Sequence, residues 1–70
     1  MYLYLYFNDG HCERHFVVKV SDLSRVKSRF LYFETPNDAE GKGTCIERDK
    51  LICFVVSRYR VANYDKHCEV

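Results

Sequence analysis

The start of the chain alternates two kinds of side chain with a period of two, which is the pattern of a β-strand. Tyr2 to Phe7 alternates Tyr with Leu or Phe, and His11 to Val20 forms a second run of strand character. Between them lies Asn8-Asp9-Gly10. Asp-Gly between two alternating runs is a strong signal for a hairpin with a two-residue type I′ turn. The pattern therefore predicts an N-terminal β-hairpin.

A two-residue turn also predicts the register of this hairpin, with Phe7 opposite Cys12 and Tyr4 opposite His15. Because side chains alternate, the hairpin then presents two surfaces. The first surface carries Leu3, Leu5, Phe7, Phe16 and Val18. The second surface carries Tyr2, Tyr4, Tyr6, His15 and Val17.

The next segment has helical spacing. Ser21-Asp22 offers a hydroxyl N-cap followed by an acid in the first turn. Leu23, Val26 and Phe30 then recur on one side of a helix. We expect a short helix from Asp22 to Leu31, which is long enough to cover one face of a sheet.

The second half of the chain predicts further strands. Tyr32-Phe33-Glu34 is a brief strand candidate, and a loop rich in Gly follows from Thr35 to Gly43. Thr44 to Glu47 and Leu51 to Val61 then flank an Arg48-Asp49-Lys50 turn. Residues 51–56 are apolar at every position, which is typical of a central strand buried on both faces.

This order, β-β-α-(β)-β-β, predicts a two-layer α+β fold. It consists of an antiparallel four- to five-stranded sheet with one short helix on one face. We expect a single compact domain over residues 1–61 and a polar C-terminal tail over residues 62–70. A chain of 70 residues buries a marginal core and often needs a further source of stability, such as a partner subunit.

Charge and hydropathy limit the classes of partner that this chain is expected to bind. The chain has 11 basic and 10 acidic residues, for a net charge of +1, which argues against bulk attraction to nucleic acid or to an anionic membrane. No apolar stretch approaches the roughly 20 residues of a membrane helix, and no basic segment precedes the first apolar residues. We expect a cytoplasmic protein (in the host cytoplasm if a phage encodes it), with its four cysteines reduced.

The second hairpin surface is the most informative feature. One helix covers one sheet face, so an apolar aromatic face would stay bare on a monomer. We therefore expect a protein interface there, with a homodimer favoured among oligomers. Two alternatives stay open: the tail folds back with Tyr64 as a lid, or the rings stack on single-stranded nucleic acid. The predicted interface residues are Tyr2, Tyr4, Tyr6, His15 and Val17.

The sequence contains few residues that could form a catalytic or metal-binding site. Cys12 and His15 have a C-x-x-H spacing, yet on a strand they point to opposite faces, and the adjacent His67 and Cys68 diverge likewise. The chain has no nucleophile motif and no Gly-rich phosphate loop before a helix. We therefore expect no catalytic residue, no metal and no cofactor. Cys45 and Cys53 would oppose each other across the Arg48-Asp49-Lys50 turn, either as a disulfide or as two buried thiols.

The favoured hypothesis is a small non-enzymatic protein-binding module that inhibits or regulates another protein and self-associates through its Tyr-rich face. Very small proteins without a catalytic motif often act in this way, and phage or mobile-element proteins are examples. The alternative is a small single-stranded nucleic-acid-binding protein that uses Tyr stacking and pairs of Arg on the phosphates. The residues predicted for those contacts are Arg25, Arg29, Arg58 and Arg60.

Overall fold

The structure, a computed structural model of the chain, describes residues 1–25 and 28–64, with the side chain of Arg25 also outside the description. Strand segments dominate, and one short 3-10 turn, η1 (Arg48–Lys50), interrupts them. The six strands are β1 (Tyr2–Phe7), β2 (Cys12–Phe16), β3 (Lys19–Arg25), β4 (Ser28–Glu34), β5 (Thr44–Glu47) and β6 (Leu51–Ser57).

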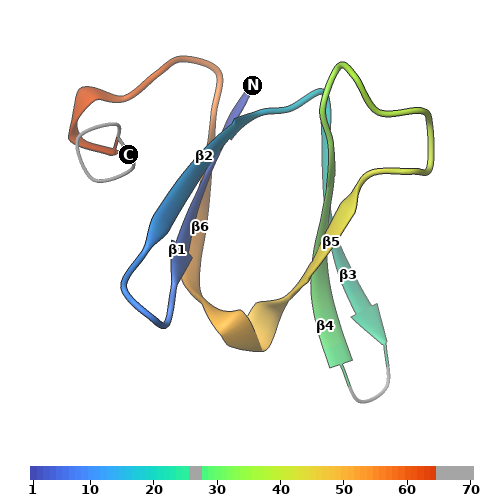
Figure 1. Cartoon of the computed structure of the whole chain (residues 1–70), viewed down its shortest axis with the longest axis horizontal. Helices are drawn as coiled ribbons and strands as arrows, with labels where there is room; N and C mark the ends of the chain where they lie inside the picture. The colour runs from blue at the N-terminus through green and yellow to red at the C-terminus, as the bar shows by residue number, and fades with distance from the viewer. Residues whose placement is uncertain (26–27, 65–70) are drawn as a thin grey trace.

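The strands form two antiparallel three-stranded sheets that face each other (Figure 1). The first sheet has the order β2-β1-β6, and the second sheet has the order β3-β4-β5. The chain passes between the sheets through residues 17–18 at one end and through η1 at the other (Figure 1). The protein is thus a small antiparallel β-rich domain, with six strands where four or five were expected.

The helix expected from Asp22 to Leu31 is wrong. Its described residues lie in β3 and β4, which pair with Asp22 opposite Leu31 and Val20 opposite Phe33. The reason is that Leu31 and Phe33 are both buried, at 0% and 2% exposure, and residues two apart share a face in a strand but not in a helix. Leu23 is 44% exposed, so the helical spacing was coincidental. Val26 lies outside the described residues.

The N-terminal hairpin is confirmed, but its predicted register is wrong by one residue. Leu3 pairs with His15, and Tyr4 pairs with Arg14. The turn is a three-residue loop, since the Phe7 N–H donates to the carbonyl of His11 at 2.9 Å and the Gly10 N–H to that of Phe7 at 3.0 Å. Gly10 adopts φ +94°, which suits a type I turn followed by a left-handed residue.

Because the side-chain period is two, this shift exchanges the faces of β2. His15 moves to the inner face, where its ring lies 4.9 Å from the ring of Phe33. Phe16 moves to the outer face and meets Tyr2 edge-on at 5.3 Å. Val17, beyond the end of β2, is 1% exposed and belongs to the core.

The core lies between the sheets and draws on both. Its buried members are Leu3, Leu5, Val17, Leu31, Phe33 and Leu51. Burying six such side chains at about 1.5–3 kcal/mol each provides the main stabilisation. The inner faces are therefore committed to packing, which leaves outer faces and sheet edges for function.

The predicted central position of residues 51–56 is also wrong. β6 stands at an edge of the first sheet, and β1 is the central strand, paired with both β2 and β6. A register shift next to Tyr6 and Phe7 interrupts the β1–β6 pairing. Ile52, at that bulge, is 68% exposed. Six successive apolar residues here mark an exposed edge and not a strand buried on both sides.

Candidate functional site

The outer face of β1 carries the three tyrosines predicted for an interface, and the chain itself covers part of this face. Tyr4 is 0% exposed, its ring lies 5.4 Å from that of Tyr64, and its hydroxyl accepts a hydrogen bond from the Val61 N–H at 3.1 Å. Tyr64 also meets Tyr6 at 6.2 Å, and burial, followed by the nearby Tyr64, raises the pKa of the Tyr6 hydroxyl.

The five predicted interface residues therefore do not form one surface. Tyr2 and Tyr6 are half-buried on the outer face beside the covered Tyr4. His15 and Val17 lie toward the core side. The lid formed by Tyr64, which the sequence left as an alternative, is the arrangement observed among residues 61–64; residues 65–70 of the predicted tail lie outside the described residues.

The four arginines predicted for nucleic-acid contacts are also divided. Arg29 belongs to β4, in the second sheet, and its guanidinium is 3.4 Å from the carboxylate of Asp22. Arg58 and Arg60 follow β6 of the first sheet, and both are exposed. The backbone of Arg25 lies in β3. One pair thus belongs to the second sheet, and the other pair follows the last strand of the first sheet.

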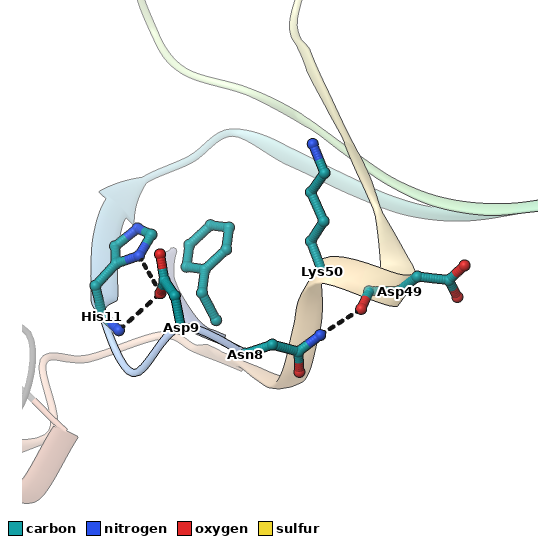
Figure 2. Close-up of a pocket in the computed structure, with 6 residues that line it drawn as sticks. Asn8, Asp9, His11, Asp49 and Lys50 are labelled. Carbon is teal, nitrogen blue, oxygen red and sulfur yellow. Dashed lines mark hydrogen bonds and ion pairs between the residues drawn. The ribbon is translucent and has the colours of Figure 1, made fainter.

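A cleft of about 390 Å³ opens beside the β1–β2 loop, with Phe7, Asn8, Asp9, His11, Asp49 and Lys50 as its lining. Figure 2 shows how the loop meets η1 there. The Asn8 N–H donates to the carbonyl of Lys50 at 2.9 Å, and the Asn8 amide donates to the carbonyl of Asp49 at 2.5 Å (Figure 2). These bonds fix the loop against the start of β6.

A chain of hydrogen bonds runs from this cleft along β2. The two ring nitrogens of His11 contact Asp9 at 2.6 Å and Glu13 at 2.9 Å. Glu13 also accepts from His15 at 2.8 Å. His11, Glu13 and His15 therefore lie on the same side of this arm of the hairpin.

These contacts shift three pKa values. The bonds to Glu13 and then to Asp9 raise the pKa of His11. The bonds from His11 and then from His15 lower the pKa of Glu13. Hydrogen bonds from the His11 backbone and then its ring lower the pKa of Asp9.

In this arrangement His11 is poorly placed to act as a general base. Both nitrogens of His11 are held by carboxylates, so neither is available to take a proton from a substrate. Within residues 1–25 and 28–64, no three His, Cys, Asp or Glu side chains are grouped to hold a metal ion. His67 and Cys68, considered as ligands from the sequence, lie outside the described residues.

The cysteines differ from expectation. Cys45 pairs with Tyr32 in β4, whereas Cys53 pairs with Tyr6 in β1. They stand in different sheets because η1 carries the chain from one sheet to the other, so the predicted pairing of the two is wrong. Both are free, exposed thiols. Cys12 is disulfide-bonded, so the expectation of four reduced cysteines does not hold for Cys12.

The feature that sequence reasoning missed is the free edge of β6. β6 pairs with β1 on one side, and none of the described strands pairs with its other side. An unpaired edge presents a row of N–H and C=O groups to another strand, and proteins usually protect it with charges, Pro or shortness. The seven residues of β6, LICFVVS, include no charge and no Pro.

The other three edge strands are protected. β2 contains Glu13, Arg14 and His15, and β3 contains Lys19, Asp22 and Arg25. β5 has four residues and ends in Glu47. Two large apolar side chains of β6 are also open to solvent, since Ile52 is 68% and Val56 is 41% exposed. The uncharged run that marks this edge is visible in the sequence, where it is also compatible with a buried central strand.

Comparisons with protein-family models, with curated proteins and with solved structures give no match to this chain. In the described part of the chain, no helix is both long enough and apolar enough to span a membrane. The functional assignment therefore rests on the geometry of the molecule.

Proposed function

We propose that this protein is a small non-enzymatic protein-binding module, an inhibitor or regulator of another protein, which binds an extended segment of its partner along β6. The observation that carries this proposal is the edge of β6 that the described strands leave unpaired, with seven uncharged residues. In strand addition, main-chain hydrogen bonds provide affinity and alternate side chains provide specificity. A cytoplasmic location and a phage origin stay predictions of the sequence.

The side chains of β6 favour an apolar partner. Ile52 and Val56 project from the strand on either side of the half-buried Phe54. A partner strand with β-branched or aromatic residues would bury them, and such cross-strand pairs contribute about 0.2–1 kcal/mol each. The sheet edge thus complements an uncharged extended segment and not an acidic or basic one.

No specific observation favours the nucleic-acid alternative, since its arginines do not converge and Tyr4 is covered. Tyr59, which lies between Arg58 and Arg60, is 77% exposed and could stack on one base. A single ring provides one stacking platform, whereas single-strand binders combine several with a basic groove.

A displayed library of random extended peptides tests the proposal. We expect peptides selected on the wild-type protein to bind the Leu23→Lys variant equally and to lose binding to Ile52→Lys. Both positions are exposed, at 44% and 68%, and both lie on edge strands, so the pair is matched. Bound peptide should slow amide hydrogen exchange in β6. Selected peptides that protect another segment and tolerate Ile52→Lys would contradict strand addition at β6.

A further inference from the structure

We infer that β6 also pairs with β6 of a second copy of this chain, antiparallel and two-fold symmetric, with Phe54 opposite Phe54 of the partner. This inference rests on the proposed function, because it names one occupant of the same edge. The first sheet of one copy would then join the first sheet of the other copy in one continuous sheet of six strands. Each copy would contribute three of them, in the order β2-β1-β6. Dimers with two-fold symmetry, in which the same surface of each copy meets, are the commonest closed oligomers.

The exposed side chains of β6 are complementary under this symmetry. With Phe54 on the axis, Ile52 of one copy faces Val56 of the other. These are the two exposed large apolar side chains of β6, at 68% and 41%, and the pairing covers both in each copy. Directly opposed residues of this kind have Cβ atoms about 4.5–5.5 Å apart. A centre one residue away would place Ile52 opposite Phe54 or opposite Arg58 instead.

Charge makes β6 better suited to self-pairing than the other long edges. The same symmetric pairing of β3 would place Asp22 opposite Asp22 and Lys19 opposite Arg25, which are all like charges. Symmetric pairing of β2 would place Arg14 opposite Arg14. Like charges directly opposed across a strand pair are destabilising. β6 meets no such repulsion, since it has no charged residue.

Between residues 58 and 64, the path of the chain leaves this edge accessible. After Ser57 the backbone turns, with the Ser57 hydroxyl donating to the carbonyl of Tyr59 at 2.6 Å and accepting from its N–H at 3.2 Å. The chain then reaches the outer face of β1, where the Val61 N–H donates to Tyr4. Residues 58–64 therefore cover a face of the first sheet and not its β6 edge.

The molar mass in solution, measured by light scattering over a concentration series, tests the inference. We expect a wild-type dimer, a Leu23→Lys variant that dimerises equally, and an Ile52→Lys variant whose dissociation constant is raised at least about tenfold. Circular dichroism spectra should show that both variants keep the wild-type fold. A wild-type protein that stays monomeric, or an Ile52→Lys variant that dimerises like the wild type, would overturn the inference.

Cross-linking tests the register. In a Cys45→Ser background, Val55→Cys places a thiol directly opposite Cys53 of the partner, within disulfide range. Cys53 alone lies diagonal to its own copy at about 7–8 Å, which is too far. We expect mild oxidation to give a covalent dimer with Val55→Cys and none without it. The reverse result would overturn the register.

The two proposals fail separately. A monomeric protein that still binds selected peptides at β6 would contradict the β6–β6 dimer and support the proposed peptide-binding function. A dimer that survives Ile52→Lys, together with peptides that map elsewhere, would remove both.

Discussion

The guanidinium carbon of Arg48 lies over the ring of Phe54, 4.8 Å from its centroid. The same side chain donates to the carboxylate of Asp22 at 2.7 Å. Since Phe54 is in β6 and Asp22 is in β3, one side chain of the connecting turn joins both sheets. A cation stacked on a ring contributes about 0.5–2 kcal/mol, depending on its exposure.

Replacing this side chain should loosen the junction between the sheets. We expect Arg48→Ala to lower the free energy of unfolding by about 1–2 kcal/mol, because it removes both the stacking and the ion pair. Arg29→Ala is the matched control: it removes a longer, 3.4 Å contact to the same Asp22 from a side chain that is 60% exposed, so its effect should stay below about 0.5 kcal/mol. Urea titration measures both, and equal effects would contradict this role of Arg48.

The burial of Leu31 in the core predicts a larger loss of stability on its replacement. Leu31 is fully buried between the sheets, whereas Leu23 is 44% exposed on the neighbouring strand. Leu31→Ala should cost about 2–5 kcal/mol of unfolding free energy, and Leu23→Ala less than about 1 kcal/mol. A helix over residues 22–31 would have buried both leucines, so similar losses in denaturant titrations would favour the helix and contradict the strands.

Stability should depend on pH through the contact of His11 with Glu13. The pKa of Glu13 is lowered from 4.5, so its contribution is present above pH 4.5 and is lost as the pH falls through the lowered pKa. The pKa of His11 is raised from 6.5, so its contribution is complete below pH 6.5 and is lost as the pH rises through the raised pKa. Both contributions are therefore present together between pH 4.5 and 6.5.

The variant His11→Asn isolates this effect. Its loss of thermal stability relative to the wild type should be largest near about pH 5.5 and should shrink by about pH 8.5. The control Asn37→Ala, an exposed residue of the loop between β4 and β5, should show no such trend. A His11→Asn difference that stays constant over this range would show that the imidazole charge contributes nothing.

The sequence predicted the hairpin but not its register, for a local reason. Asn8-Asp9-Gly10 supports both a two-residue and a three-residue loop. The hydrogen bonds of Phe7 with His11 and Gly10 and the positive φ of Gly10 select the longer one. One residue of difference then moved His15 from the Tyr face to the core side. Loop length is thus a local choice with a global effect on which side chains meet.

The strands of the second sheet were hidden for a different reason. Residues 19–25, KVSDLSR, are polar apart from Val20 and Leu23, so the segment has little β character of its own. Its strand form depends on pairing with β4, whose Leu31 and Phe33 are drawn into the core. Tertiary packing overrode local propensity here. The sequence does not reveal the free edge of β6, because an uncharged run does not distinguish an edge strand from a central one.

The loop between β4 and β5 contains a position that needs glycine for space. A Cβ built on Gly43 would lie 2.0 Å from the carbonyl oxygen of Phe33, far inside contact distance. Gly43 also donates its N–H to the Tyr32 hydroxyl at 3.0 Å, and that hydroxyl donates to Glu34 at 2.5 Å. We expect Gly43→Ala to destabilise the protein by about 1–3 kcal/mol. Lys42→Ala, one residue earlier and exposed, should be close to neutral in the same thermal melts.

The contact of Val61 with Tyr4 predicts the behaviour of the covering segment. Tyr4→Phe keeps the ring but removes the acceptor of the Val61 N–H, at a cost of about 1 kcal/mol. Hydrogen exchange at Val61 should accelerate while exchange in β1 and β2 stays unchanged. Tyr59→Phe alters an exposed hydroxyl and serves as the control. Unchanged exchange at Val61 in Tyr4→Phe would contradict this anchoring.

The place of β1 in the sheet has a consequence during synthesis. β1 needs both β2 and β6 to complete its hydrogen bonding, yet β2 ends at residue 16 and β6 begins at residue 51. At about 5–20 residues per second, translation delays the second partner by about 2–7 s. During that interval the YLYLYF edge of β1 lacks its second partner and is open to pairing with another strand.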